Sequence, residues 1–252
     1  SMLGYPLVIH EQNAVAGTTN RYLAPFAKRV LCGFANVFPE KRRPIVVGNP
    51  VRSAILAVAS VPQLTAFTET RPLRLLVLGG SLGSLPLNER VPPALLRLPA
   101  SIRRVIAVRH QCGRDHVELT SQGYSSGDVS VEVMPFIDDM AATYQWADLV
   151  ICRSGALTVA ELAATGTPAV LVPLPHAIDD HQTHNALALV QAGAALLIPQ
   201  AELTPDVLGD VVADMVAEPQ RLSQMAQRAL EQAHSDATDR VVGHMLEVCN
   251  ES

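Results

Sequence analysis

Short apolar segments, separated by stretches long enough for a helix, recur through most of this chain and constrain its fold more than any other feature. Apolar strands that alternate with helices are typical of a parallel sheet with helices on both faces. The pattern predicts an α/β fold with a doubly wound parallel sheet, followed by two or three helices after Thr204. The expected strands are Leu73–Leu78, Arg104–Val108, Val129–Val133, Leu149–Cys152, Ala169–Val172 and Ala195–Ile198.

The opening segment fits poorly into this sheet. Pro6–His10 and Pro44–Gly48 have the composition of short strands, and Thr18–Val30 has the apolar spacing of a helix. One such β–α–β piece is too small for a domain of its own. We therefore expect residues 3–50 to be the end of a preceding domain with its linker, and residues 51–252 to form the main domain. The last helix is a candidate to pack back on the first domain.

Composition narrows the class of protein. With 252 residues, 48% of them hydrophobic, the chain can bury one large core or two modest ones. No apolar run reaches the roughly 18 residues of a membrane span. A net charge of −5 argues against general nucleic-acid binding. The four cysteines lack the spacing of a metal site, which indicates reduced thiols in the cytoplasm. We expect neither a metal nor a cofactor.

The segment from Cys152 to Asn185 is the most informative about function. Ser154 and Gly155 precede an expected helix, and the first, unpaired N–H groups of that helix would form a small anion site. Glu161 follows about two turns later. It would reach the sugar of a nucleotide whose phosphates lie at the helix start.

A second helix start follows the apolar run Ala169–Val172. Asp179–Asp180 lies just before a helix expected from His181, and a simple N-cap also explains this pair. Gln182 and Asn185, three residues apart, would share one face of that helix. Two helix N-termini with hydrogen-bonding side chains suit a large anion such as a nucleotide sugar.

Three other motifs have both a structural and a functional interpretation. Gly79–Gly83 is a phosphate-loop candidate without the Lys-Ser/Thr of a P-loop, and a tight strand-to-helix turn explains it equally well. His10–Asn13 places four hydrogen-bonding side chains at a strand end, which favours a function because burying them without a ligand or a network is costly. Asp138–Asp139 is most simply a helix N-cap, and neither acidic pair has metal-site spacing.

Six motifs, in this order and spacing, give the chain its resemblance to a known family, the MurG family of peripheral membrane glycosyltransferases. The motifs are HEQNAVAGTTN (residues 10–20), GNPVR (48–52), GGSLG (79–83), FIDDM (136–140), CRSGALTVAE (152–161) and DDHQTHNA (179–186). The resemblance implies a GT-B architecture of two Rossmann-like domains, here a C-terminal domain with a remnant of the other. It also implies metal-independent, inverting transfer of N-acetylglucosamine from UDP-N-acetylglucosamine to lipid I, forming lipid II at the cytoplasmic face of the bacterial inner membrane.

The resemblance also implies roles for single residues. Asn13 and Gln182 would bond hydroxyls of the N-acetylglucosamine ring from opposite domains, and Arg52 would lie near the nucleotide. Ser81 would hold the diphosphate, and the backbone of Ile137 would recognise the uracil edge.

One helix matches the donor-binding helix of the family. Its N-terminal N–H groups and a hydroxyl would meet phosphate and sugar, and Glu161 would bond the ribose hydroxyls. The substrate-binding run is Ala156, Leu157, Thr158, Val159, Ala160 and Glu161. Many relatives have a glutamine directly before the residue that matches Gln182, and this chain has His181 there. The contact that this glutamine makes in the family is therefore in doubt here.

The family's N-terminal Gly-rich loop with a histidine is not in this chain. The lipid I acceptor site and the group that deprotonates the attacking hydroxyl are expected in that other half, so no catalytic residue is assigned here. We expect this polypeptide to bind donor without transferring it. Two other classes stay open, a GT-B-type UDP-N-acetylglucosamine 2-epimerase and a non-catalytic nucleotide-sugar binding module. HEQN followed by GNPVR argues against the epimerase.

Overall fold

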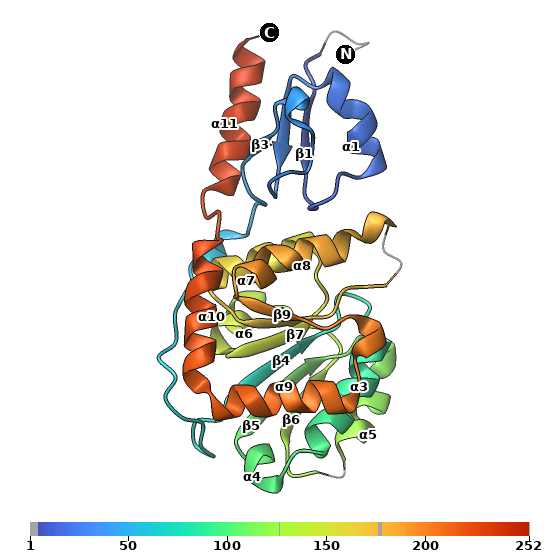
Figure 1. Cartoon of the computed structure of the whole chain (residues 1–252), viewed down its shortest axis with the longest axis vertical. Helices are drawn as coiled ribbons and strands as arrows, with labels where there is room; N and C mark the ends of the chain where they lie inside the picture. Colours follow the sequence, from blue (N-terminus) through green and yellow to red (C-terminus); the bar gives the residue numbers. More distant parts are fainter. Residues whose placement is uncertain (1–4, 126, 176–177, 252) are drawn as a thin grey trace.

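The computed structural model describes residues 5–125, 127–175 and 178–251, and Leu3, where the first expected domain begins, lies outside these ranges. Most of the chain builds one six-stranded sheet, in the order β6-β5-β4-β7-β8-β9, in which every pair of neighbouring strands is parallel. Its strands are β4 (Leu73–Leu78), β5 (Ile106–Gln111), β6 (Ser130–Met134), β7 (Leu149–Cys152), β8 (Ala169–Leu171) and β9 (Ala195–Leu197). The predicted doubly wound parallel sheet is confirmed (Figure 1).

Alternate residues of β4 explain why helices cover both faces of this sheet. Leu73, Leu75 and Val77 belong to one hydrophobic cluster, with side chains of α3, α5 and α9. Leu76 and Leu78 belong to a second cluster, with side chains of α6, α7 and α8. Because side chains alternate along a strand, a continuous apolar strand needs a cover on each face.

The helices that follow the opening segment fill the predicted intervals, and three of them lie after Thr204, as expected. They are α2 (Ser53–Leu56), α3 (Leu85–Leu96), α4 (Ala100–Arg103), α5 (Val117–Tyr124), α6 (Met140–Trp146), α7 (Ala156–Thr165), α8 (His181–Gln191), α9 (Pro205–Ala217), α10 (Pro219–Glu231) and α11 (Ala237–Asn250). Single 3-10 turns lie at Glu40–Arg42, Arg114–His116, Ile178–Asp180 and Gln200–Glu202.

The opening segment forms a separate three-stranded parallel sheet of β1 (Val8–Glu11), β2 (Arg29–Cys32) and β3 (Ile45–Val46), with α1 (Thr18–Leu23) beside it. The predicted helix Thr18–Val30 was wrong in its second half. A 3-10 turn, Ala24–Phe26, ends the helix, and Pro25 within it has no N–H to continue the α-helical pattern. The next apolar residues form the central strand β2, which is buried between β1 and β3.

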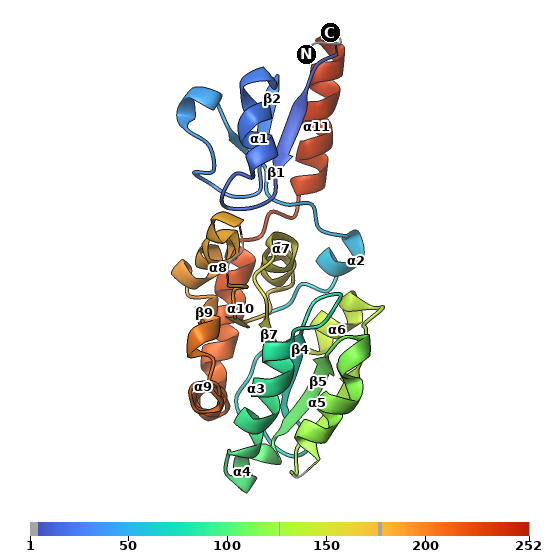
Figure 2. The same cartoon turned by 90° about the vertical axis from the view of Figure 1, so that its right-hand side faces the viewer.

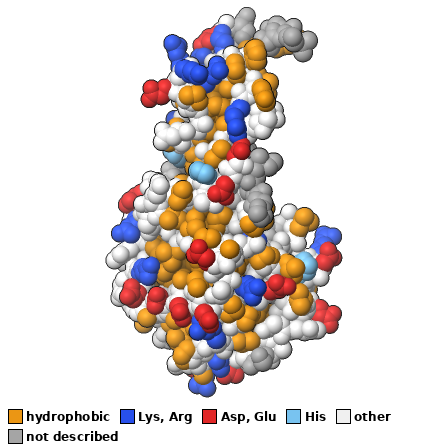
Figure 3. Space-filling view, turned by 45° about the vertical axis from the view of Figure 1, so that its right-hand side comes forward, with side chains coloured by type: hydrophobic (Ala, Val, Ile, Leu, Met, Phe, Trp, Pro, Cys, Tyr) orange, Lys and Arg blue, Asp and Glu red, His pale blue; other side chains and the backbone are white. Residues whose placement is uncertain are grey.

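The last helix, α11, returns to this small sheet. Arg240 Nη2 donates to the carbonyl oxygen of Val46 at 2.6 Å, and Arg29 Nη2 bonds Glu251 Oε1 at 2.9 Å. We call the three-stranded sheet with α1 and α11 the small lobe, and the six-stranded sheet with α2 to α10 the large lobe. Helices α7 and α8 lie between the large sheet and the small lobe in both ribbon views (Figure 2). The small lobe projects from the large lobe as a narrower body (Figure 3).

Within the described residues, no helix has both the length and the apolar composition needed to span a bilayer.

Candidate functional site

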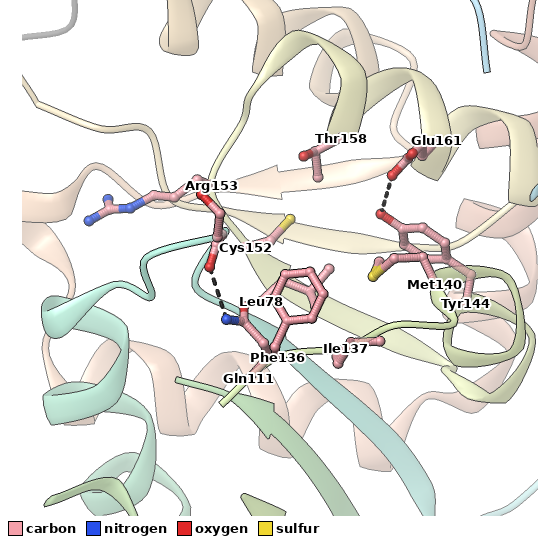
Figure 4. Close-up of a pocket in the computed structure, with 12 residues that line it drawn as sticks. Leu78, Gln111, Phe136, Ile137, Met140, Tyr144, Cys152, Arg153, Thr158 and Glu161 are labelled. Atoms are coloured by element: carbon pink, nitrogen blue, oxygen red, sulfur yellow. Dashed lines mark hydrogen bonds between the residues drawn. The ribbon is translucent and has the colours of Figure 1, made fainter. Parts of the chain in front are cut away.

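A cavity of about 230 Å³ opens at the carboxyl ends of the large-lobe strands. In parallel α/β sheets, ligands bind at this edge. The cavity brings together four residues that the sequence singled out, Ser81 after β4, Ile137 after β6, and Thr158 and Glu161 on α7. Figure 4 shows Ile137, Thr158 and Glu161 around it. Gln111, Tyr144 and other residues complete its lining.

The glycine-rich turn after β4 forms one wall of the cavity. Gly80 and Gly83 have φ values of +84° and +81°, which glycine adopts at little cost. A Cβ on Gly83 would collide with the carbonyl oxygen of Cys112. The turn therefore needs glycine for purely structural reasons, and it also places Ser81 at the cavity.

Gln111, at the end of β5, holds this turn against a second loop, and sequence reasoning missed it. Its side-chain oxygen accepts from Gly79 N at 3.1 Å, and its Nε2 donates to the carbonyls of Gly80 at 2.9 Å and Pro135 at 3.2 Å. The strand expected from the sequence ends at Val108, three residues before Gln111, so the prediction did not include this residue. A polar residue that continues a buried strand to its carboxyl end was the signal available in the sequence.

Glu161 lies at the opposite wall, about two turns into α7. Its Oε2 accepts the hydroxyl of buried Tyr144 at 3.0 Å, and its Oε1 lies 3.5 Å from Nη2 of Arg52. Burial, and next the charge of Glu161, raise the pKa of Tyr144 well above its usual value, so this phenol stays protonated and donates. The contact also brings Arg52, which does not line the cavity, to its edge.

Helix α7 begins at the cavity, and its N-cap is Gly155. The N–H groups of the first three helical residues, 156–158, have no partner within the helix, so they can bind an anion. Ser154 is fully buried, and its hydroxyl has no hydrogen-bond partner among the described residues.

The six residues of the α7 run do not share one face. Thr158 and Glu161 line the cavity. Val159 is buried in the hydrophobic cluster, and Ala160 faces a gap between α7 and the small lobe. Leu157 is 46% exposed. Among these side chains, Thr158 and Glu161 are placed to meet a ligand in the cavity, and the first turn offers its backbone.

Asn13 and Gln182 lie outside the cavity lining, Asn13 between β1 and α1 and Gln182 in the first turn of α8. Asn13 Oδ1 accepts from Nδ2 of Asn185 at 3.1 Å, and the same Nδ2 donates to the carbonyl of Ser154 at 3.2 Å. Asn185 Oδ1 accepts from Ala14 N at 2.7 Å. Fully buried Asn185 thus ties the small lobe to the start of α7. Gln182 accepts from the backbone N–H of Leu174 at 3.0 Å.

The motif His10–Asn13 forms an internal network. The carboxylate of buried Glu11 accepts from Asn13 N, Gly17 N and Asn20 Nδ2, each at 2.8–2.9 Å. Burial works against ionisation, but these bonds outweigh it and lower the pKa of Glu11. Much of the polarity in this motif is thereby satisfied within the protein.

The two acidic pairs differ in what they do. Asp139 caps α6 by accepting from Ala142 N at 2.9 Å, which confirms its interpretation as an N-cap. Asp180 precedes α8 with a positive φ of 50° and makes no side-chain cap to the backbone. It accepts instead from the hydroxyl of Thr183 at 2.8 Å. No group of three or more potential metal ligands occurs in the part of the chain that the structure describes.

Comparison with known proteins identifies the family. A model described as the glycosyltransferase family 28 C-terminal domain matches residues 74–241. The chain belongs to glycosyltransferase family 28. The match extends from β4, before the glycine-rich turn, into α11 and so includes all four predicted cavity residues.

Two curated relatives of this family 28 chain are named UDP-N-acetylglucosamine--N-acetylmuramyl-(pentapeptide) pyrophosphoryl-undecaprenol N-acetylglucosamine transferase. The one from Tolumonas auensis is 52% identical over 96% of this chain and 66% of its own length. The one from Chromohalobacter salexigens is 52% identical over 98% of this chain and 66% of its own length. The chain thus spans about two thirds of the length of these relatives.

Solved structures agree with the family assignment. The crystal structure of MurG from Acinetobacter baumannii is 42% identical, with a TM-score of 0.84 over 98% of this chain and 68% of that one. A putative UDP-N-acetylglucosamine 2-epimerase from Listeria monocytogenes has a TM-score of 0.68 at 15% identity, over 98% of this chain and 69% of that one. At that identity the likeness shows a shared fold alone. The GT-B type of fold expected from the sequence is confirmed.

Proposed function

We propose that this chain is the donor-binding part of an inverting glycosyltransferase that moves N-acetylglucosamine from UDP-N-acetylglucosamine to lipid I, forming lipid II. The observation that carries the proposal is 52% identity, over 96% of the chain, to a relative whose name states this transfer. A cavity at the ligand-binding edge of the sheet, where the quoted motifs meet, supports it.

The nucleotide would occupy this cavity. The backbone of Ile137 would bond the uracil edge, and Ser81 with the free N–H groups of residues 156–158 would meet the diphosphate. A helix N-terminus stabilises negative charge without any change in protonation. The charge on the diphosphate grows as UDP leaves, so the same groups would assist departure of the leaving group.

The ribose would be held by Glu161. Tyr144 and Arg52 approach one carboxylate oxygen each, so the carboxylate is oriented before any ligand arrives. Ribose hydroxyls can donate to the remaining lone pairs, or displace Arg52, whose side chain is 63% exposed.

The N-acetylglucosamine ring would lie between the lobes. Asn13 and Gln182 would bond its hydroxyls from opposite sides. Asn185 supports this arrangement, since it holds Asn13 and the carbonyl of Ser154 with one amide. In an inverting transfer, the 4-hydroxyl of the muramoyl sugar attacks the anomeric carbon on the face opposite UDP, so the acceptor must approach from the side of the small lobe.

We propose residues 3–50 as the end of an acceptor-binding domain and residues 51–252 as the donor-binding domain. The lipid I site and the base that removes the hydroxyl proton would belong to the remaining third of the longer protein. Lipid I is a membrane lipid, so that protein would act peripherally at the cytoplasmic face of the inner membrane. Binding to nucleic acid is not part of this proposal.

A transfer assay tests the function. The longer protein that contains this chain is incubated with UDP-N-acetylglucosamine labelled in its sugar, with and without a soluble lipid I analogue. We expect a labelled disaccharide lipid and free UDP only when the analogue is present. Conversion of the donor alone to the UDP sugar epimerised at C2, or with water to UDP and the free epimerised sugar, would instead support the epimerase. Binding of the donor without any product would support a non-catalytic module.

A further inference from the structure

Gln111 is a buried polar side chain in the middle of the proposed nucleotide site. Only 4% of it is exposed, at the carboxyl end of β5, between β4 and β6. A buried amide is stable only when its donors and acceptor are paired, so its partners reveal what the residue does.

Among the described residues, every hydrogen-bond partner of the Gln111 side chain is a backbone group, and these groups belong to two separate segments. Gly79 N and the carbonyl of Gly80 lie in the glycine-rich turn after β4, and the carbonyl of Pro135 lies in the loop after β6. Gly80 precedes Ser81, and Pro135 lies two residues before Ile137. One side chain therefore bonds next to both proposed nucleotide contacts.

The hydrogen bonds of Gln111 require an amide side chain. Its oxygen faces an N–H group and its nitrogen faces two carbonyl oxygens, so both the acceptor and the two donors are used. A carboxylate at this position would face two carbonyl oxygens. An apolar side chain would break all three bonds, although Gly79 N would keep the backbone carbonyl of Gln111 at 3.1 Å and the carbonyl of Gly80 would keep Gly83 N at 2.9 Å.

We propose that Gln111 is a positioning residue that couples the glycine-rich turn to the Pro135–Ile137 loop, so that base and diphosphate recognition depend on a single side chain. This proposal rests on the proposed function for the identity of the ligand, but the coupling itself is a property of the ligand-free chain. Its removal should loosen both segments together.

The first test replaces Gln111 with methionine, which has similar size and no amide. Hydrogen exchange of the ligand-free protein should become faster at residues 79–83 and at residues 135–137, with the strands of the large sheet unchanged. Gln122→Met, at an exposed glutamine on α5 that donates to Glu118, is the matched control and should change neither segment. Faster exchange in only one segment, or in neither, would overturn the coupling.

Calorimetry then measures the affinity of each variant for UDP-N-acetylglucosamine. Gln111→Met should weaken binding at least tenfold, and Gln122→Met should not. If the unsubstituted chain fails to bind this probe, the proposed function fails, while the exchange experiment still decides the coupling. If the unsubstituted chain binds and Gln111→Met binds within twofold of it, the positioning role is wrong.

The pH dependence of donor binding by Gln111→Glu is a further test, because a simple loss of packing would not change with pH. A carboxyl group facing two carbonyl oxygens has a raised pKa, and only its protonated form can donate to one of them. Donor affinity of Gln111→Glu should rise several-fold from about pH 8 to about pH 5.5, relative to the unsubstituted chain. Arg153 and Glu161 line the same cavity in both proteins. Any effect of their charges on donor affinity therefore cancels when the affinity of Gln111→Glu is divided by that of the unsubstituted chain at the same pH. A ratio that does not change with pH would contradict the assigned hydrogen bonds.

Discussion

At the scale of single residues, Glu161 is the clearest target. Accepting two ribose hydroxyls would make charge-assisted bonds worth about 1.5–3 kcal/mol together. Glu161→Ala should therefore weaken UDP binding about tenfold or more while the fold is retained. Calorimetry measures the affinity, and Glu118→Ala on the exposed face of α5 is the control. Unchanged UDP affinity in a folded Glu161→Ala variant would remove the ribose role.

His110 gives a prediction on stability. It is fully buried on β5, where its Nε2 faces Asn88 Oδ1 at 3.1 Å and its Nδ1 faces the hydroxyl of Tyr124 at 2.9 Å. Burial lowers the pKa of His110 to about 3. Asn88 Oδ1 can only accept, so Nε2 carries the proton and the ring is neutral.

The sign of the pH effect follows from this shift. Between about pH 3 and pH 6.5 the unfolded chain binds a proton at His110 that the folded chain does not, so stability falls as the pH falls through this window. The loss is about 1.4 kcal/mol per pH unit. Urea denaturation at several pH values from 7 to 5 should show a steeper loss for the unsubstituted chain than for His110→Gln. Parallel profiles would show that His110 does not titrate as described.

At the scale of elements, two glycines of the glycine-rich turn allow the cost of backbone strain to be measured apart from the cost of a steric clash. Gly80 and Gly83 have similar positive φ values, but a Cβ meets nothing within 4 Å at Gly80 and a backbone oxygen at Gly83. Strain alone costs about 1–3 kcal/mol. Gly83→Ala should therefore lower the free energy of unfolding by clearly more than Gly80→Ala, since only Gly83→Ala also forces the turn away from Cys112. Equal losses in urea denaturation would mean that the turn moves freely.

Helices and strands could be predicted from the sequence where the local pattern of apolar residues determines them. The apolar runs Leu73–Leu78 and Leu149–Cys152 coincide with β4 and β7, because strands buried on both faces need continuous apolar sequence. Strand β2 (Arg29–Cys32) was missed because its first apolar residue, Val30, also fits the helical spacing that begins at Thr18. Its true partners, β1 and β3, are apparent only in three dimensions.

The candidate site shows the same limit. The helix start at Gly155 and the position of Glu161 follow from local pattern, as does Ser81 after an apolar strand. The bonds of Gln111, and of Asn185 to Asn13, join residues 24 to 172 positions apart, and no local pattern encodes them. The separate directions of Val159 and Glu161 on α7 depend on where neighbouring helices pack.

At the scale of the whole molecule, we expect this chain alone to bind donor but to transfer nothing. Most proposed nucleotide contacts lie in the large lobe, so UDP-N-acetylglucosamine should bind measurably. Asn13 depends on the small lobe, and losing two or three hydrogen bonds of ~1 kcal/mol each would weaken binding by one to two decades. Calorimetry and a lipid I transfer assay on the same sample test this expectation. Lipid II formation near the rate of the longer protein would refute it.

Transfer by the longer protein should survive a strong chelator. The proposed site meets the diphosphate charge with the α7 N-terminus and Ser81, and Arg52 lies at its edge. Initial rates with and without EDTA should agree. Activity that EDTA abolishes and magnesium or manganese restores would show that the diphosphate site needs a cation.

The return of α11 to the small lobe has a consequence for how the chain is made. The face of β2 that α11 contacts must wait until Ala237–Asn250 leaves the ribosome, long after β3 ends at Val46. At 5–20 residues per second, that delay is roughly 10 to 40 seconds. The large lobe, from Ser53 to Glu231, is continuous in sequence and can fold within that time. The half-built small lobe stays open to chaperones meanwhile, so its sheet is synthesised before the large lobe and completed after it.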